Sequence, residues 1–114
     1  MEKDLEQRTK LFSLAVFKFT ASLPRTREAD VLCRQLLRSA TSIGSKYREA
    51  NRGASRADFA NKIGTVQKEA SETQYWIELL AESGIAAAAT ANERHKESSE
   101  LVAIFTVIGK KLKE

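Results

Sequence analysis

Five arginines, two hydroxyl residues and one valine recur along residues 27–52 at intervals of four and three, the spacing of residues on one face of an α-helix. At a rise of about 1.5 Å per residue this line is about 40 Å long. Guanidinium groups pair with phosphate oxygens, and each neutralised phosphate adds salt-dependent affinity. The pattern is typical of a surface that follows a nucleic-acid backbone. Its members are Arg27, Val31, Arg34, Arg38, Thr41, Ser45, Arg48 and Arg52.

Positive charge is concentrated in this part of the chain, yet charge alone leaves three interpretations open. Residues 25–68 contain ten Lys/Arg and four Asp/Glu, whereas residues 69–114 contain five and eight. The arginine face is a solvated surface, a contact with the acidic half of a neighbouring subunit, or a nucleic-acid site. No exposed aromatic residues alternate with the arginines to stack single-stranded bases. In the nucleic-acid interpretation the binding residues are Arg27, Arg34, Arg38, Arg48 and Arg52, and the last four are the expected phosphate partners.

Catalytic and metal chemistry find little support in the sequence. A di-iron bundle needs two Glu-x-x-His pairs, but the one histidine, His95, follows Asn92 at that spacing. The one cysteine, Cys33, has no histidine nearby and cannot form an internal disulfide. Glu69 and Glu72 lie three residues apart, which suits salt bridges better than acid–base work without a histidine partner. We therefore expect no enzyme activity, no cofactor and no metal site.

The elements that position the arginines follow from two apolar ladders with 4-3-4-3 spacing. This spacing places each ladder on one side of a long helix that packs in coiled-coil fashion. The segment 51–55 separates the two helices. The first ladder is Ala29, Cys33, Leu36, Ala40, Ile43, Tyr47 and Ala50; the second is Phe59, Ile63, Val66, Ala70, Thr73, Ile77 and Leu80.

Caps and periodicity predict four helices at about 4–22, 26–51, 56–83 and 88–112. Thr26 and Ser55 are suited to cap the second and third helices, and Pro24 and Gly84 lie beyond the ends of the first and third. The fourth helix has the least defined start, between residues 87 and 91. Short connections favour an all-α, antiparallel up-down-up-down four-helix bundle that forms a single domain over residues 1–114.

Apolar residues also lie on the outer sides of the first and third helices. An isolated bundle would leave them in water, so we prefer a subunit interface to scattered surface hydrophobics. The composition, 42% hydrophobic and 30% charged, is that of a soluble protein. The sequence lacks a membrane-spanning run and a signal peptide, so we expect a cytoplasmic protein that does not contact membranes. The predicted interface residues are Leu14, Phe17, Ala21, Tyr75 and Leu79.

Several segments, in order, resemble the four-helix-bundle proteins of the 23S ribosomal RNA intervening-sequence family. They include Gln35–Ile43, Tyr47–Ala50, Ser55–Phe59 and Lys68–Ile77. The resemblance covers nearly the whole chain. It implies a bundle that assembles into a homopentameric ring. It also implies a relation to the accessory variability determinants of diversity-generating retroelements, which are basic pentamers that bind nucleic acid and a reverse transcriptase.

Two functional hypotheses result. The first is a non-enzymatic, ring-forming adaptor that binds RNA or DNA through the arginine face, with a reverse transcriptase as a protein partner that the resemblance implies. The second is a protein-interaction scaffold with no nucleic-acid role, in which the same face contacts an acidic partner or a neighbouring subunit. Self-association is expected in both.

Overall fold

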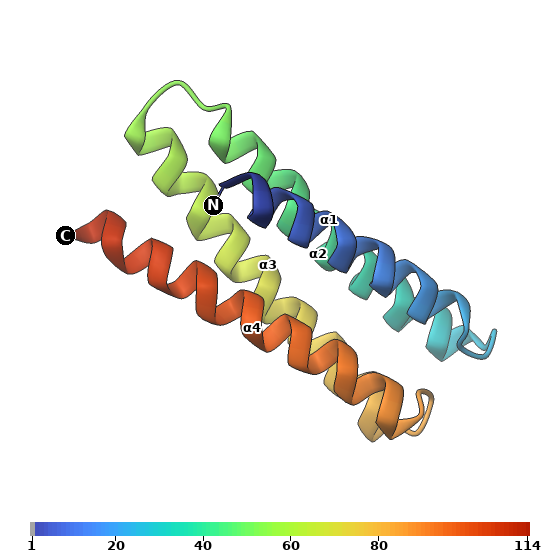
Figure 1. Ribbon diagram of the computed structural model, residues 1–114. Coiled ribbons are helices and arrows are strands. Elements are labelled where there is room, and N and C mark those ends of the chain that lie inside the picture. Colours follow the sequence, from blue (N-terminus) through green and yellow to red (C-terminus); the bar gives the residue numbers. More distant parts are fainter. Residues whose placement is uncertain (1) are drawn as a thin grey trace.

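The computed structural model describes residues 2–114, which form four long α-helices. These are α1 (Glu2–Ala21), α2 (Arg27–Asn51), α3 (Arg56–Glu82) and α4 (Ala88–Lys113). Each helix runs back along the one before it, so the molecule is an elongated bundle of 44 × 21 × 20 Å (Figure 1). Residues 2–114 contain no strand, and the prediction of an all-α four-helix protein is confirmed.

The starts of α2 and α3 are fixed by side-chain caps. The Thr26 hydroxyl oxygen accepts a hydrogen bond from the Ala29 amide (3.1 Å), and the Ser55 hydroxyl oxygen accepts one from the Asp58 amide (3.1 Å). Each bond satisfies a backbone donor that the first helical turn leaves free. The predicted caps are therefore present.

The other connections follow backbone restrictions. α1 ends three residues before Pro24, and α3 is followed by Gly84, whose φ of +83° lies in the left-handed region that favours glycine. α4 begins at Ala88 without a side-chain cap. The start of α4 is thus set by the tertiary packing of its later residues rather than by a local cap.

The two apolar ladders form the centre of the core. Their members are buried except for Cys33 and Phe59, which are half-buried at the edge and pack against the core. The Tyr47 ring meets the Phe105 ring edge to face, with centroids 5.3 Å apart. α1 contributes Phe12, Val16 and Phe19, and α4 contributes Ala91, Leu101 and Phe105.

The seams between the helices are unequal. α2 packs most extensively on α3, whereas α1 contacts α4 least. α1 approaches α2 closely at Gly44, where an added Cβ would lie 3.2 Å from the Thr9 hydroxyl oxygen. A pocket of about 590 Å³ opens between α1 and α4, with Leu5 and Ile104 in its lining. Across residues 2–114, no helix combines the length and the apolar character that a membrane span requires.

Candidate nucleic-acid interface

The first two arginines of the α2 face are exposed and little engaged. Arg27 contacts Glu28, its neighbour in sequence, at 3.3 Å. Arg34 makes no ion pair with any of the side chains that the structure describes. This part of the face therefore presents guanidinium groups to solvent.

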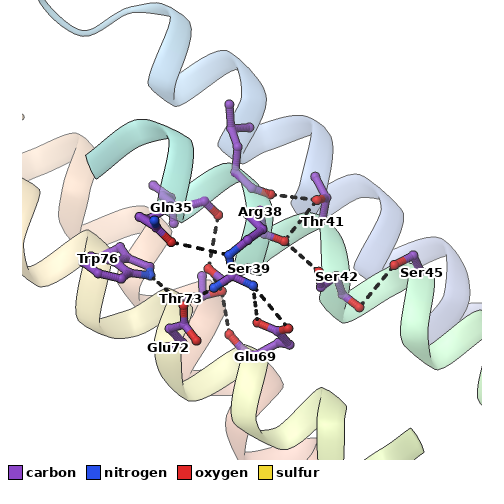
Figure 2. A network of polar contacts seen from close by, with 12 residues as sticks. Gln35, Arg38, Ser39, Thr41, Ser42, Ser45, Glu69, Glu72, Thr73 and Trp76 are labelled. Carbon is purple, nitrogen blue, oxygen red and sulfur yellow. Dashed lines mark hydrogen bonds and ion pairs between the residues drawn. The ribbon is translucent and has the colours of Figure 1, made fainter. Parts of the chain in front are cut away.

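Arg38 instead joins α2 to α3. Its Nη1 lies 3.3 Å from Glu69 Oε1, its Nη2 donates to Glu72, and its Nε donates to Gln35 Oε1 at 3.4 Å (Figure 2). Glu72 also accepts a hydrogen bond from Trp76 Nε1 at 3.2 Å. One cation is thus shared by two carboxylates, and the predicted salt-bridging role of Glu69 and Glu72 is confirmed.

A buried polar chain lies beneath this cluster. The Thr73 hydroxyl lies 2.9 Å from Ser39 Oγ and 2.7 Å from the Glu69 carbonyl oxygen of its own helix, and the Ser39 hydroxyl donates to the Leu36 carbonyl (3.2 Å). Thr73 and Ser39, which Figure 2 shows side by side on α3 and α2, are fully buried. Hydroxyls satisfied in this way align the two helices at a fixed register. Arg38 is therefore part of a structural seam.

Arg48 and Arg52 face α1, where they share one acid, Glu6. Arg48 Nε lies 3.8 Å from Glu6 Oε1, and Arg52 Nη1 lies 3.4 Å from Glu6 Oε2. The Asn51 amide donates to the same Oε2 at 2.8 Å. This hydrogen bond, together with the two guanidinium groups, lowers the pKa of the Glu6 carboxyl, although partial burial acts in the opposite direction. The Glu6 carboxyl is therefore ionised at neutral pH.

The Glu6 pocket is the hollow of about 460 Å³ that Glu6, Arg48 and Arg52 line, on the seam between α1 and α2. Lys10 lines it and makes no ion pair with any described side chain. Glu49 also lines it, but this acid pairs with Lys46 (3.6 Å) and Lys62 (3.3 Å). Cationic donors thus outnumber the acids that contact them. The remaining lining includes Ser13, Gly44 and Ser45.

The predicted interface residues are largely exposed. The residue Phe17 is 60% exposed, Leu14 and Tyr75 are about half exposed, Ala21 is exposed, and Leu79 is half-buried. Their role in assembly stays a prediction. Two further large apolar residues that the sequence analysis did not name, Leu11 and Val107, are also exposed, as is Val31 of the arginine face.

The remaining reactive residues have ordinary surroundings. His95 Nε2 lies 2.8 Å from Glu78 Oε2, so the ring bridges α4 to α3. Burial and nearby Asp30 raise the pKa of the Cys33 thiol, while Arg25 opposes this, so Cys33 stays a thiol at neutral pH. Among the described residues, no three His, Cys, Asp or Glu side chains are grouped in a way that could hold a metal.

Sequence analysis missed the partners of the arginines. Glu6, Lys10 and Asn51 carry no motif, and only the antiparallel pairing of the start of α1 with the end of α2 brings them together. A signal existed in the predicted topology, because a short connection between two long helices places the first turn of one beside the last turn of the other.

The chain is therefore an all-α four-helix protein with a basic face along one helix. The family model of the 23S rRNA-intervening sequence protein matches residues 2–106, and the chain belongs to this family. The predicted family membership is thus confirmed.

The structure is similar to one solved by crystallography, that of a protein of unknown function from the S23 ribosomal protein family of Bacteroides thetaiotaomicron. The TM-score is 0.86 at 33% sequence identity, and the match covers 92% of this chain and 97% of that one. No curated protein matches the chain.

Proposed function

We propose that this protein is a non-enzymatic adaptor that binds the backbone of RNA or DNA through the arginine face of α2 and assembles with copies of itself. The observation that carries the proposal is the exposure of arginines on this face that either have no acidic partner or share a single one. Arg34 is exposed without an ion pair among the described side chains, and the Arg48 and Arg52 side chains remain 53% and 64% exposed despite their contact with Glu6. Both contacts with Glu6 are long, at 3.8 and 3.4 Å, and their arginine side is exposed, so they contribute little free energy and a phosphate can replace the carboxylate.

The geometry narrows the set of phosphate partners. Arg38 already meets two carboxylates, and moving it to a phosphate would leave Glu69, whose side chain is 16% exposed, without a cation. Glu6 is similarly buried, at 22% exposed, but it keeps its hydrogen bond from Asn51 when the arginines leave. Losing a partner is costly for a charge that is mostly removed from water. We therefore assign phosphate contact to Arg27, Arg34, Arg48 and Arg52 and a structural role to Arg38.

A gel-shift series over increasing salt tests the proposal with the purified oligomer and single-stranded RNA, single-stranded DNA and duplex DNA as probes. Arg34→Gln with Arg48→Gln removes two phosphate contacts. The variant should bind all sequences of a probe more weakly by a similar factor, with a salt slope lower by about 1.5 to 2. The matched control is Lys110→Gln with Lys111→Gln, which removes two exposed cations from α4.

Two results of this series would contradict the proposal. One is an arginine variant that binds as tightly as the parent at moderate salt. The other is a pair of observations: the parent protein retains no nucleic acid at any salt concentration, and light scattering shows that the arginine variants assemble to a different mass. The second result would favour the scaffold hypothesis, in which the face contacts an acidic protein or a neighbouring subunit.

The proposed assembly is supported by the exposed apolar residues on the outer sides of α1 and α3. Leu14 and Phe17 lie on one helix and Tyr75 on the other, so two different surfaces of one subunit are available for contact. Contact between unlike surfaces generates rings when the rotation closes. A homopentamer is the ring size that the family resemblance implies, and a reverse transcriptase is the protein partner that we propose on the same basis.

Phe17→Glu should reduce the mass of the assembly measured by light scattering, whereas Lys18→Glu, at the next position, should not.

A further inference from the structure

We infer that the Glu6 pocket binds one phosphate group of a nucleic-acid backbone and that Glu6 occupies the place of this phosphate in the free protein. The inference rests on the proposed function and adds to it a defined subsite and a competing side chain. The donors that hold Glu6 are an amide and two guanidinium groups. The same set suits phosphate oxygens, because guanidinium and amide groups only donate to them.

The distances show that the arginines hold Glu6 loosely. Charge-assisted hydrogen bonds between nitrogen and oxygen are about 2.7–2.9 Å long. The Asn51 amide meets this range at 2.8 Å, but the Arg52 and Arg48 contacts are 3.4 and 3.8 Å. Asn51 thus holds the carboxylate, while both guanidinium groups have donors left for a better-placed acceptor.

The charge of the pocket favours a second anion. Lys10, Arg48 and Arg52 face one carboxylate, that of Glu6, because Glu49 pairs with Lys46 and Lys62 instead. A phosphate would meet the two arginines and Lys10, and Ser13 and Ser45 supply hydroxyl donors at the same opening. Both hydroxyls bond only to backbone carbonyls of their own helix or of the helix beside it, at 3.1–3.4 Å, so they can turn toward a ligand.

Glu6 then sets the affinity of the pocket. In the free protein its negative charge keeps the arginines on the protein surface and opposes any anion that approaches. On binding, the phosphate takes the guanidinium donors, and the Glu6 carboxylate either turns to solvent or remains on Asn51 alone. Removing its charge while keeping an acceptor for Asn51 should strengthen nucleic-acid binding.

The test compares Glu6→Gln with Glu49→Gln by fluorescence anisotropy of a labelled 20-nucleotide RNA over a salt series. Both variants remove one negative charge from the lining of the same pocket, but only the first releases Arg48 and Arg52. Glu6→Gln should bind the RNA about threefold to tenfold more tightly at ~0.2 M salt. The slope of its log affinity against log salt concentration should be steeper by about 1 to 2. Glu49→Gln should gain clearly less. Thermal unfolding of each variant shows that the fold is intact.

The outcomes separate this inference from the proposed function. Suppose that the parent protein binds RNA through its arginines, but Glu6→Gln and Glu49→Gln gain affinity equally or neither gains affinity. The pocket is then not a phosphate site, and the proposed function stands. If Glu6→Gln gains even when Arg48 and Arg52 are both replaced by Gln, its effect does not act through these arginines and the inference is wrong. If the parent retains no nucleic acid at any salt, both fail together.

Discussion

At Arg38, α2 meets α3 through one guanidinium shared by two carboxylates, whereas at Arg48 and Arg52 it meets α1 through two guanidiniums that share one carboxylate. All three arginines lie on the same face at helical spacing. The first arrangement satisfies its cation fully and lies over a buried hydrogen-bonded chain. The second arrangement contains more guanidinium groups than carboxylates and so carries net positive charge.

Residue type and spacing alone therefore do not define the role of an arginine on a helical face. The neighbouring helix decides it, because α3 supplies two acids three residues apart and α1 supplies one. We call these two regions the α2–α3 seam and the α1–α2 seam. The first should respond to mutation in stability and the second in binding.

The largest expected effect is at the buried part of the α2–α3 seam. Thr73→Ala should lower the free energy of unfolding by about 2 kcal/mol, because it removes the hydroxyl that contacts Ser39 and leaves a small cavity. Urea unfolding measures this, and Thr73→Val separates the hydroxyl from the volume. Thr65→Ala is the control, since its hydroxyl bonds to the Asn61 carbonyl on the same helix at a half-buried position. If Thr73→Ala and Thr65→Ala lowered the free energy of unfolding equally, the buried hydroxyl at the α2–α3 seam would have no special structural role.

The next effect is on binding, at the α1–α2 seam. Arg48→Gln with Arg52→Gln should weaken RNA binding about tenfold at ~0.2 M salt, because two phosphate contacts are lost. Unfolding should change little, because both arginines are exposed, their contacts with Glu6 are long, and Glu6 keeps its hydrogen bond from Asn51. Arg38→Gln is the matched control, and it should leave anisotropy titrations nearly unchanged. A larger loss of affinity from Arg38→Gln than from the double variant would reverse the assignment.

How far the sequence could lead is clear from these same residues. The ladders predict the core of α2 and α3 because burial follows the helical period, and Thr26 and Ser55 predict the helix starts because their caps are local. The partners of the arginines are not local. Glu6 is 46 residues from Arg52 and Glu69 is 31 from Arg38. Which acid reaches which arginine depends on how the helices are rotated and shifted against each other, and helical period alone leaves that open.

A smaller effect is expected from the charged part of the α2–α3 seam. Arg38→Gln should lower the free energy of unfolding by about 1 kcal/mol, since Glu69 and Glu72 would then lie close together without a cation. Adding Glu69→Gln should recover part of the loss, which a double-mutant cycle measures. Arg27→Gln is the control on the same face, because its partner Glu28 is its exposed neighbour. A cycle with no coupling energy would show that the Arg38 cluster is only solvated surface.

The smallest expected effect is a pH dependence of stability at the α1–α2 seam. The hydrogen bond from Asn51, aided by Arg52 and Arg48, lowers the pKa of the Glu6 carboxyl in the folded protein. A carboxyl with a lowered folded pKa contributes stability that is complete above its unfolded pKa, about 4.3, and is lost as the pH falls through the folded value. The parent should therefore be slightly more stable than Glu6→Gln at pH 7, and this difference should shrink as the pH falls below about 4.3.

Urea midpoints at a series of pH values between neutral and strongly acidic measure this difference. Asn51→Ala removes the largest cause of the lowered pKa and should move the NMR titration of the Glu6 side-chain carboxyl carbon (Cδ) toward the ordinary glutamate value. A Glu6 titration unaffected by Asn51→Ala would mean that the two arginines, rather than the amide, hold the carboxylate. That result would make the arginines less available to phosphate, and it would turn the α1–α2 seam into a second structural clamp like the one at Arg38.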